Sequence, residues 1–231
     1  MANEPKLDWK RILLFGAHPD DEIIGAGGTL ARFSAQGAHI TVVTFTSGET
    51  GYTTADAKAT IAATRAQEMA AVDPILGIHR RISLGKPTQA VVNDRETYQE
   101  CVRIIREVQP DVILTHAHWD RHRDHRAISE ITEEAWYKAA ENIMTDKGVP
   151  WRTPELYYYE IFELFPLPSL LVDITETFDK KFAAMQTQTS QMAVLNDICD
   201  YVKALAATRG YQRGTPYAEA FGRSSFFPTF G

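Results

Sequence analysis

The sequence contains little cysteine. Its 231 residues include two, Cys101 and Cys199, which stand far apart and form no C-x-x-C pair. A disulfide scaffold needs more cysteines and a zinc ribbon needs closely spaced pairs, so both classes are excluded. This scarcity is typical of a reduced protein, and we expect a cytoplasmic location.

The sequence also lacks a long apolar run. No run approaches the roughly 20 apolar residues that a membrane-spanning helix requires. Residues 1–11 are polar and contain no hydrophobic segment of the kind found in a secretory signal. We therefore expect no membrane partner.

Basic residues are not in excess. Lys and Arg number 24 against 30 Asp and Glu, which gives a formal net charge of −6 at pH 7. A nucleic-acid-binding protein carries a positive footprint, so nucleic acid is not expected as a partner. The content of 44% hydrophobic and 23% charged residues is close to the globular average and excludes disorder, collagen and coiled coil.

Short apolar runs at 12–15, 40–45 and 112–114 predict buried strands, because each is bounded by polar or turn residues. A helical stretch at 23–36 separates the first two runs, which is the spacing of a βαβ unit in a parallel sheet. Further helices are expected at 56–72 (capped by Thr53 or Thr54, with Pro74 beyond its end), 94–108 (capped by Asp94), 124–140, 175–185 (capped by Thr175) and 195–207.

The C-terminal part differs from the rest in its composition. Prolines punctuate two strand-like runs, at 156–162 and 169–174, which predict an edge insertion or a small β hairpin. Residues 210–231 are rich in glycine and aromatics and predict an irregular but packed tail. We expect a single α/β domain over 1–231, with 1–10 as an N-terminal tail.

Polar residues follow each of the three predicted strands, in clusters at 17–22, 46–51 and 115–125. In an open parallel sheet, ligands bind outside the carboxyl ends of the strands. The three clusters are therefore expected to converge on one crevice.

In the first cluster, His18 and Asp21 stand three residues apart. Pro19 biases His18 toward an extended conformation, and a helix that follows allows both side chains to face one point. An imidazole and a carboxylate are a zinc-type ligand pair, while Asp20 is left free to act on water. The alternative is an acidic helix cap, but the adjacent carboxylates of Asp20, Asp21 and Glu22 repel one another unless a cation or several donors satisfy them.

In the third cluster, His122 and His125 stand three apart at a predicted helix start and can share a face. Either could supply the third protein ligand of a catalytic metal, and Asp124 is placed to orient a neighbouring histidine. The alternative is a solvated helix terminus, because arginines are interspersed among these residues.

The other four histidines carry weaker signals. His116 and His118 would point to the same side if the strand continues through them, and a crevice position or a structural role is open for each. His39 and His79 lie away from the clusters and are expected on the surface or in packing.

The combined motifs resemble those of the PIG-L/LmbE-like family of zinc-dependent N-deacetylases, which act on N-acetylglucosaminyl compounds. The first motif is 18–22 with the glycine-rich continuation 25–30, and the second is 122–125, where Arg123 replaces the family's usual proline. Further similar segments are 46–51, 65–68 and 214–221.

The resemblance implies a three-layer α/β/α, Rossmann-like and mostly parallel sheet. It implies that His18, Asp21 and His125 hold zinc, or another divalent metal such as Fe²⁺. The substrate would be a small N-acetylated sugar or glycoside. Relatives commonly form trimers or hexamers, so a homo-oligomer is expected.

The resemblance also implies roles for individual residues. Asp20 would be the general base that activates water. His122, in its protonated form, would stabilise the oxyanion or protonate the leaving amine, with Asp124 tuning it. Arg65 and Glu49 are expected at the substrate, Arg65 at a sugar or a phosphate-like group, although a solvated helix charge is the alternative for Arg65.

Two rival functions remain at this point. Some proteins similar to this family are metal-dependent hydratases that add water to unsaturated dicarboxylic acids, and the intact ligand motif favours hydrolysis without excluding hydration. A nucleotide-binding module is suggested by the glycines at 25–28. They do not fit G-x-G-x-x-G, however, and carboxylates stand where a phosphate would approach.

Overall fold

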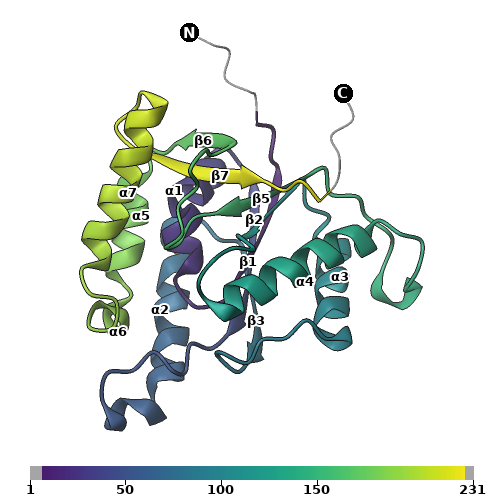
Figure 1. The fold of residues 1–231 in the computed structure, drawn as a ribbon, viewed down its shortest axis with the longest axis horizontal. Helices are drawn as coiled ribbons and strands as arrows, with labels where there is room; N and C mark the ends of the chain where they lie inside the picture. Colours follow the sequence, from purple (N-terminus) through teal and green to yellow (C-terminus); the bar gives the residue numbers. More distant parts are fainter. Residues whose placement is uncertain (1–6, 227–231) are drawn as a thin grey trace.

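The computed structural model describes residues 7–226, which form a seven-stranded sheet with helices on both faces (Figure 1). The strand order is β3-β2-β1-β4-β5-β7-β6. The strands are β1 (Arg11–Gly16), β2 (His39–Thr46), β3 (Arg80–Lys86), β4 (Val112–His116), β5 (Glu155–Tyr159), β6 (Leu170–Asp173) and β7 (Ala218–Arg223). The α-helices are α1 (Asp21–Ala35), α2 (Ile61–Leu76), α3 (Arg95–Val108), α4 (Arg123–Ala139), α5 (Phe178–Gln186), α6 (Thr189–Met192) and α7 (Ile198–Arg213).

Strand β1 shows why both faces of the sheet are covered. Successive side chains of a strand point to opposite faces. Accordingly, Ile12 and Leu14 pack into one apolar core, and Leu13 and Phe15 pack into the other. Helices α1, α2, α5 and α7 cover the first face, and α3 and α4 cover the second (Figure 1). The three-layer arrangement implied by the resemblance is therefore confirmed.

The sheet is parallel from β3 through β5 in the strand order. Strand β7 pairs antiparallel with both β5 and β6. Of the two arrangements expected for 156–162 and 169–174, the hairpin is wrong, because β7 lies between β5 and β6, whereas the sheet-edge position is confirmed for β6, the last strand in the order. The irregular tail predicted for 210–231 is also wrong, because α7 runs to Arg213 and 218–223 is a sheet strand; residues 227–231 lie outside the described part.

Strand β3 was not predicted from the sequence. It runs along the edge of the sheet with the sequence RRISLGK, and its side chains are exposed or half-buried rather than buried. An edge strand of this kind carries no apolar run that would mark it.

Three helices deviate clearly from their expected positions, and the one predicted at 195–207 is α7, which begins at Ile198 and ends at Arg213. Helix α2 begins at Ile61, after a 3₁₀ turn at Ala55–Ala59, and it includes Pro74 in its last turn, so the range 56–72 is wrong at both ends. Helix α5 is capped by Thr177 instead of Thr175. The Thr175 hydroxyl is already engaged, because it donates to the Asp173 carboxylate at 2.6 Å.

One further local expectation is confirmed. Asp94 caps α3 and accepts a hydrogen bond from the Thr97 N–H at 2.8 Å, as predicted. Within the expected N-terminal tail, Trp9 is buried and its indole N–H donates to Glu155 at 2.9 Å, while residues 1–6 lie outside the described part. Between residues 7 and 226, no helix is long and apolar enough to span a membrane.

Candidate active site

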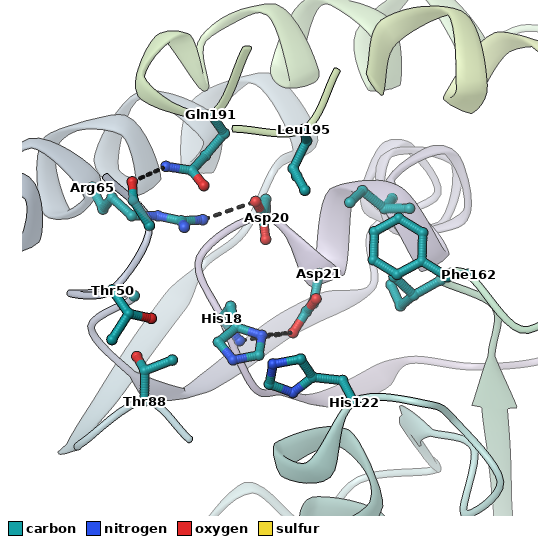
Figure 2. Close-up of a pocket in the computed structure, with 14 residues that line it drawn as sticks. His18, Asp20, Asp21, Thr50, Arg65, Thr88, His122, Phe162, Gln191 and Leu195 are labelled. Carbon is teal, nitrogen blue, oxygen red and sulfur yellow. Dashed lines mark hydrogen bonds and ion pairs between the residues drawn. The ribbon is translucent and has the colours of Figure 1, made fainter. Parts of the chain in front are cut away.

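A cavity of about 150 Å³ opens at the carboxyl-terminal edge of the sheet (Figure 2). Residues that follow each of the five parallel strands line it, together with residues of α1, α2 and the region around α6. They include His18, Asp20, Gly48, Thr88, His122 and Phe162. The chain passes from β1 to β2 on one side and β4 lies on the other, so the cavity lies at a switch point, where open α/β sheets bind ligands. Its volume is below the roughly 300–1,000 Å³ of drug-sized sites, which suits one end of a substrate.

The turn after β1 separates two adjacent carboxylates. Asp20 has a φ of 128°, which is unusual for a residue with a side chain, and its carbonyl accepts the N–H groups of Ile23 and Ile24 as α1 begins. Such a backbone costs about 1–3 kcal/mol and is found where the surrounding structure enforces it, often at functional sites. The turn sends the Asp20 and Asp21 carboxylates to different partners.

Three potential ligands converge below this turn. His18 Nδ1 lies 3.2 Å from His125 Nε2, and the two carboxylate oxygens of Asp21 lie 3.5 Å from one or the other of these nitrogens. A tetrahedral zinc ion with bonds of about 2.0–2.1 Å holds its ligand atoms about 3.3–3.4 Å apart. The spacing of these donors therefore fits such an ion.

The wider cluster contains more donors than one ion needs. Two groups have ligand atoms within 4.8 Å of one another, His18 with His122 and His125, and Asp21 with His116 and His125. His125 belongs to both groups. One oxygen of Asp21 is also occupied by the backbone, since it accepts the N–H groups of Ala17 and His18 at 2.9 and 2.7 Å.

Each of the two central histidines has a carboxylate on its far side. His18 Nε2 lies 3.2 Å from Asp124, and His125 Nδ1 lies 3.1 Å from Asp120. A carboxylate in this position holds the ring orientation of a metal-binding histidine and fixes which nitrogen carries the proton. Burial alone lowers the pKa of His18, but the Asp124 and Asp21 carboxylates outweigh it and raise that pKa to about 10.

Asp20 has a different partner. Its carboxylate pairs with the Arg65 guanidinium at 2.8 Å, and both side chains are buried. Arg65 also donates to the Pro19 carbonyl. Burial raises the pKa of Asp20 to about 6, against the opposing charge of Arg65. The structure therefore places Arg65 in the cavity lining and turns its guanidinium toward Asp20.

His122 caps α4 through its ring. Its Nδ1 accepts the N–H of Asp124 at 3.2 Å, so in the neutral ring the proton is on Nε2. Burial, together with the charges of His18 and His125, lowers the pKa of His122. The neutral tautomer already offers an N–H to the cavity, so the protonated form expected from the sequence is not needed for a donor here.

Two residues expected at the site have partners other than the expected ones. The Glu49 carboxylate accepts hydrogen bonds from the N–H and hydroxyl of Thr88, both at 2.7 Å, and it ties two loops together outside the cavity lining. The Asp124 carboxylate contacts His18, whereas its link to His122 is through the backbone.

The remaining four histidines differ in their burial and contacts. His116 is buried, stacks on His125 with ring centroids 3.8 Å apart, and lies 3.1 Å from Asp21. Burial and the charge of His125 lower the pKa of His116 to about 4. His118 packs against Trp119 instead. His39 and His79 stack on each other at an exposed position, as expected.

The glycines at 25–28 lie inside α1, where they allow close packing. A Cβ atom at Gly25 would lie 2.2 Å from the Tyr159 ring, and one at Gly28 would lie 2.6 Å from Ile174. These glycines contact side chains rather than an open anion site, which removes the basis of the nucleotide-binding alternative.

The sequence alone missed several residues of the site. Asp120, Phe162, Gln191 and Leu195 belong to it, although only Asp120 carried a signal, as an acidic residue among the histidines of 115–125. The other three lie in or next to β5 and α6, and the sequence near them does not reveal where these elements lie in the fold.

Fold and side chains together define an α/β protein with a cluster of His and Asp side chains, able to hold a metal ion, at the switch point of its sheet. A family model described as PIG-L, GlcNAc-PI de-N-acetylase, matches residues 13–136, more than half of the chain. The protein belongs to the PIG-L family.

Individual relatives are similar over different lengths. A 1D-myo-inositol 2-acetamido-2-deoxy-alpha-D-glucopyranoside deacetylase of Rhodococcus erythropolis is 34% identical over 177 residues, which cover 64% of this chain and 60% of that protein. The chain therefore matches about three fifths of the length of such a curated relative.

Two solved structures superpose equally well. An N,N'-diacetylchitobiose deacetylase of Pyrococcus horikoshii has a TM-score of 0.85 and 25% identity, covering 95% of this chain and 85% of that one. A 4-carboxy-2-hydroxymuconate hydratase of Pseudomonas putida has the same TM-score and identity, covering 96% and 98%. The fold alone does not separate the two reactions, so the side chains must.

Proposed function

We propose that the protein is a metal-dependent N-deacetylase that hydrolyses the acetamide group of an N-acetylated sugar or glycoside. The carrying observation is the convergence of His18, Asp21 and His125 at 3.2–3.5 Å beside a buried carboxylate, Asp20, in one cavity. The named deacetylases among its relatives support this reaction. The ligand set suits zinc, and Fe²⁺ is the alternative metal.

Those three residues would hold the metal. When bound there, zinc would supply a Lewis acid that polarises the acetyl carbonyl and makes water more acidic. Asp120 and Asp124 would keep the two imidazoles turned toward the ion.

The chain's own residues then account for the proton movements. Asp20 accepts a proton from the water that attacks the acetyl carbon, and Arg65 holds its carboxylate in place. The Nε2–H of His122 donates to the oxyanion as it develops. The C–N bond breaks as Asp20 passes the proton it took from water to the leaving nitrogen, and acetate and a free amine are released while Asp20 returns to its carboxylate form.

The charge of the cavity favours a neutral substrate over a dicarboxylic acid. Among the lining residues that the structure describes, Arg65 is the single Lys or Arg, and its guanidinium already faces Asp20 and the Pro19 carbonyl. Two carboxylates of a hydratase substrate would need free cationic partners. Threonine hydroxyls at 50 and 88 suit sugar hydroxyls instead.

A direct assay tests the proposal. Zinc-loaded protein is incubated with a panel of N-acetylated sugars and glycosides, and acetate and primary amine are measured together. We expect equal amounts of both products, and a rate about 10²–10⁴-fold lower from Asp20→Asn protein. Hydration of an unsaturated dicarboxylic acid, with no amine released from any sugar, would instead establish the hydratase. The single-domain organisation, cytoplasmic location and trimeric or hexameric assembly stay predictions.

A further inference from the structure

Gln191 is the polar residue that the C-terminal half contributes to the cavity. It lies in α6, is 2% exposed, and stands outside the residues 13–136 that the family model matches. A buried glutamine needs hydrogen-bond partners for both ends of its amide.

The nitrogen end of the Gln191 amide is satisfied by the protein. Nε2 donates to the Gly51 carbonyl at 3.1 Å and to the Ser190 hydroxyl at 2.9 Å. A carbonyl can only accept, so Nε2 and not Oε1 must face Gly51. The oxygen end makes no hydrogen bond within residues 7–226, and in Figure 2 it points toward the paired Arg65 and Asp20 side chains in the cavity wall.

The position of Gln191 is held by two neighbouring segments. Glu68, three residues after Arg65 on α2, accepts hydrogen bonds from the Thr189 hydroxyl and from the N–H and hydroxyl of Ser190, at 2.7–3.0 Å. On the other side, a Cβ atom at Gly51 would lie 3.0 Å from Gln191 Oε1. The amide is therefore fixed before a substrate arrives, which lowers the entropy lost on binding.

Two further residues give part of the cavity wall an apolar surface. Figure 2 shows Phe162 across from Thr50 and Thr88, and Leu195 lies beside Gln191. A sugar ring has an apolar C–H face and a rim of hydroxyls, and this arrangement matches both.

We propose that Gln191 is a specificity-determining residue whose Oε1 accepts a hydrogen bond from one ring hydroxyl of the substrate sugar. This inference rests on the proposed function. An acceptor without a donor partner selects for groups that carry a hydrogen and against acceptor-only groups at the same place, such as a methyl ether, a carboxylate or a fully ionised phosphate.

The experiment pairs protein variants with substrate variants. The substrates are the methyl glycoside of N-acetylglucosamine and its derivatives that are deoxygenated or O-methylated at one hydroxyl at a time. The proteins are the zinc-loaded wild type, Gln191→Met, which keeps the volume but removes the amide, and Gln186→Ala, an exposed glutamine at the end of α5 that serves as a matched control. The measured quantity is kcat/KM.

In the wild type and in Gln186→Ala, removing the recognised hydroxyl is expected to lower kcat/KM about two- to tenfold. In Gln191→Met, kcat/KM for the parent glycoside is expected to fall by the same factor. The deoxygenated derivative should then have the same kcat/KM as the parent. If Gln191→Met keeps the wild-type ranking of the derivatives, or lowers kcat/KM equally for all of them, the inference is wrong.

Binding to Asp20→Asn protein separates this inference from the proposed function. The Asp20→Asn and Asp20→Asn/Gln191→Met proteins are titrated with the same glycosides by calorimetry. Hydroxyl-dependent binding that Gln191→Met abolishes supports the role of Gln191 even if the wild type releases no amine, in which case only the proposed function falls. No binding of any glycoside overturns both.

Discussion

The N-terminal and C-terminal halves of the chain contribute to the cavity in different ways. The first half, through α4, supplies the His/Asp cluster, Asp20 and Arg65 from strand ends and a helix packed on the sheet. The second half, from β5 on, supplies Ile161, Phe162, Gln191 and Leu195. The family model ends at residue 136 and so covers the first group alone.

Under the proposed function, residues of the first half carry out the reaction and residues of the second half select the substrate. Metal ligands and a general base must be held within a few tenths of an ångström, which rigid strand ends provide. Contacts that select a substrate can vary without disturbing that geometry. Changes in the first half are therefore expected to lower turnover on every substrate, and changes in the second half to alter the ratio between substrates.

The largest effect is expected from loss of a metal ligand. His125→Ala removes the residue that belongs to both groups of potential ligands, so we expect loss of bound metal and of all amine release. Metal content by mass spectrometry and the amine assay check this, and a chelator should reproduce it in the wild type. His39→Ala, at an exposed stacked pair, is the control. Full activity in metal-free protein would contradict the proposed chemistry.

Next in size is Asp20→Asn. The substitution keeps the shape of the side chain but removes the proton acceptor, so kcat should fall by about 10²–10⁴ on all substrates. Metal content should stay close to one ion per chain. Loss of the metal in this variant would show instead that Asp20 is a ligand.

A smaller effect is expected from Asp120→Asn. Its carboxylate lies 3.1 Å from His125 Nδ1, and loss of such a partner lowers metal affinity or activity by about 10–100-fold. Titration with a competing chelator measures the affinity. Asp146→Asn, an exposed carboxylate beside Lys147, is the control. Unchanged metal affinity would mean that Asp120 does not orient His125.

The smallest effect on activity is expected from a substitution in the second half, and it should change KM and not kcat. Phe162→Ala removes a half-buried ring from the apolar wall, which we expect to weaken binding by about 1 kcal/mol, or about fivefold in KM, with little change in kcat. The increase should depend on the group attached to the sugar. Leu167→Ala, 88% exposed and outside the cavity, is the control. An equal fall in kcat on every substrate would contradict the proposed difference between the two halves.

The His/Asp cluster could be predicted because its residues fall into two short segments, 18–21 and 122–125, and each segment follows a buried apolar strand. One argument for it was incomplete. The adjacent carboxylates at 20–22 were expected to need a cation, yet Asp20 pairs with Arg65 and Glu22 pairs with Arg81 at 2.7 Å. These arginines come from α2 and β3, far along the chain, so no local pattern could reveal them.

The second half was harder to predict for a related reason. The sequence of β7, AEAFGR, has few residues that favour strands. It is stabilised by contacts from a distance, including a buried pair between Glu219 and Lys181 at 2.5 Å. The place of Gln191 in the cavity likewise could not be predicted, because it depends on contacts with Glu68 and Gly51, which are distant in sequence.

The position of β7 has a consequence for the order in which the chain folds. Strand β6 joins the sheet through β7, with Leu170 opposite Phe221 and Asp173 opposite Ala218. During synthesis, residues 170–173 leave the ribosome before 218–223, so β6 must wait unpaired for a strand made later. Long-range pairing of this kind slows folding. Glu219 of β7 also accepts N–H groups of α1 at Gly28 and Thr29. The helix that begins at Asp21 thus receives contacts from a strand whose Glu219 is made 191 residues after Gly28.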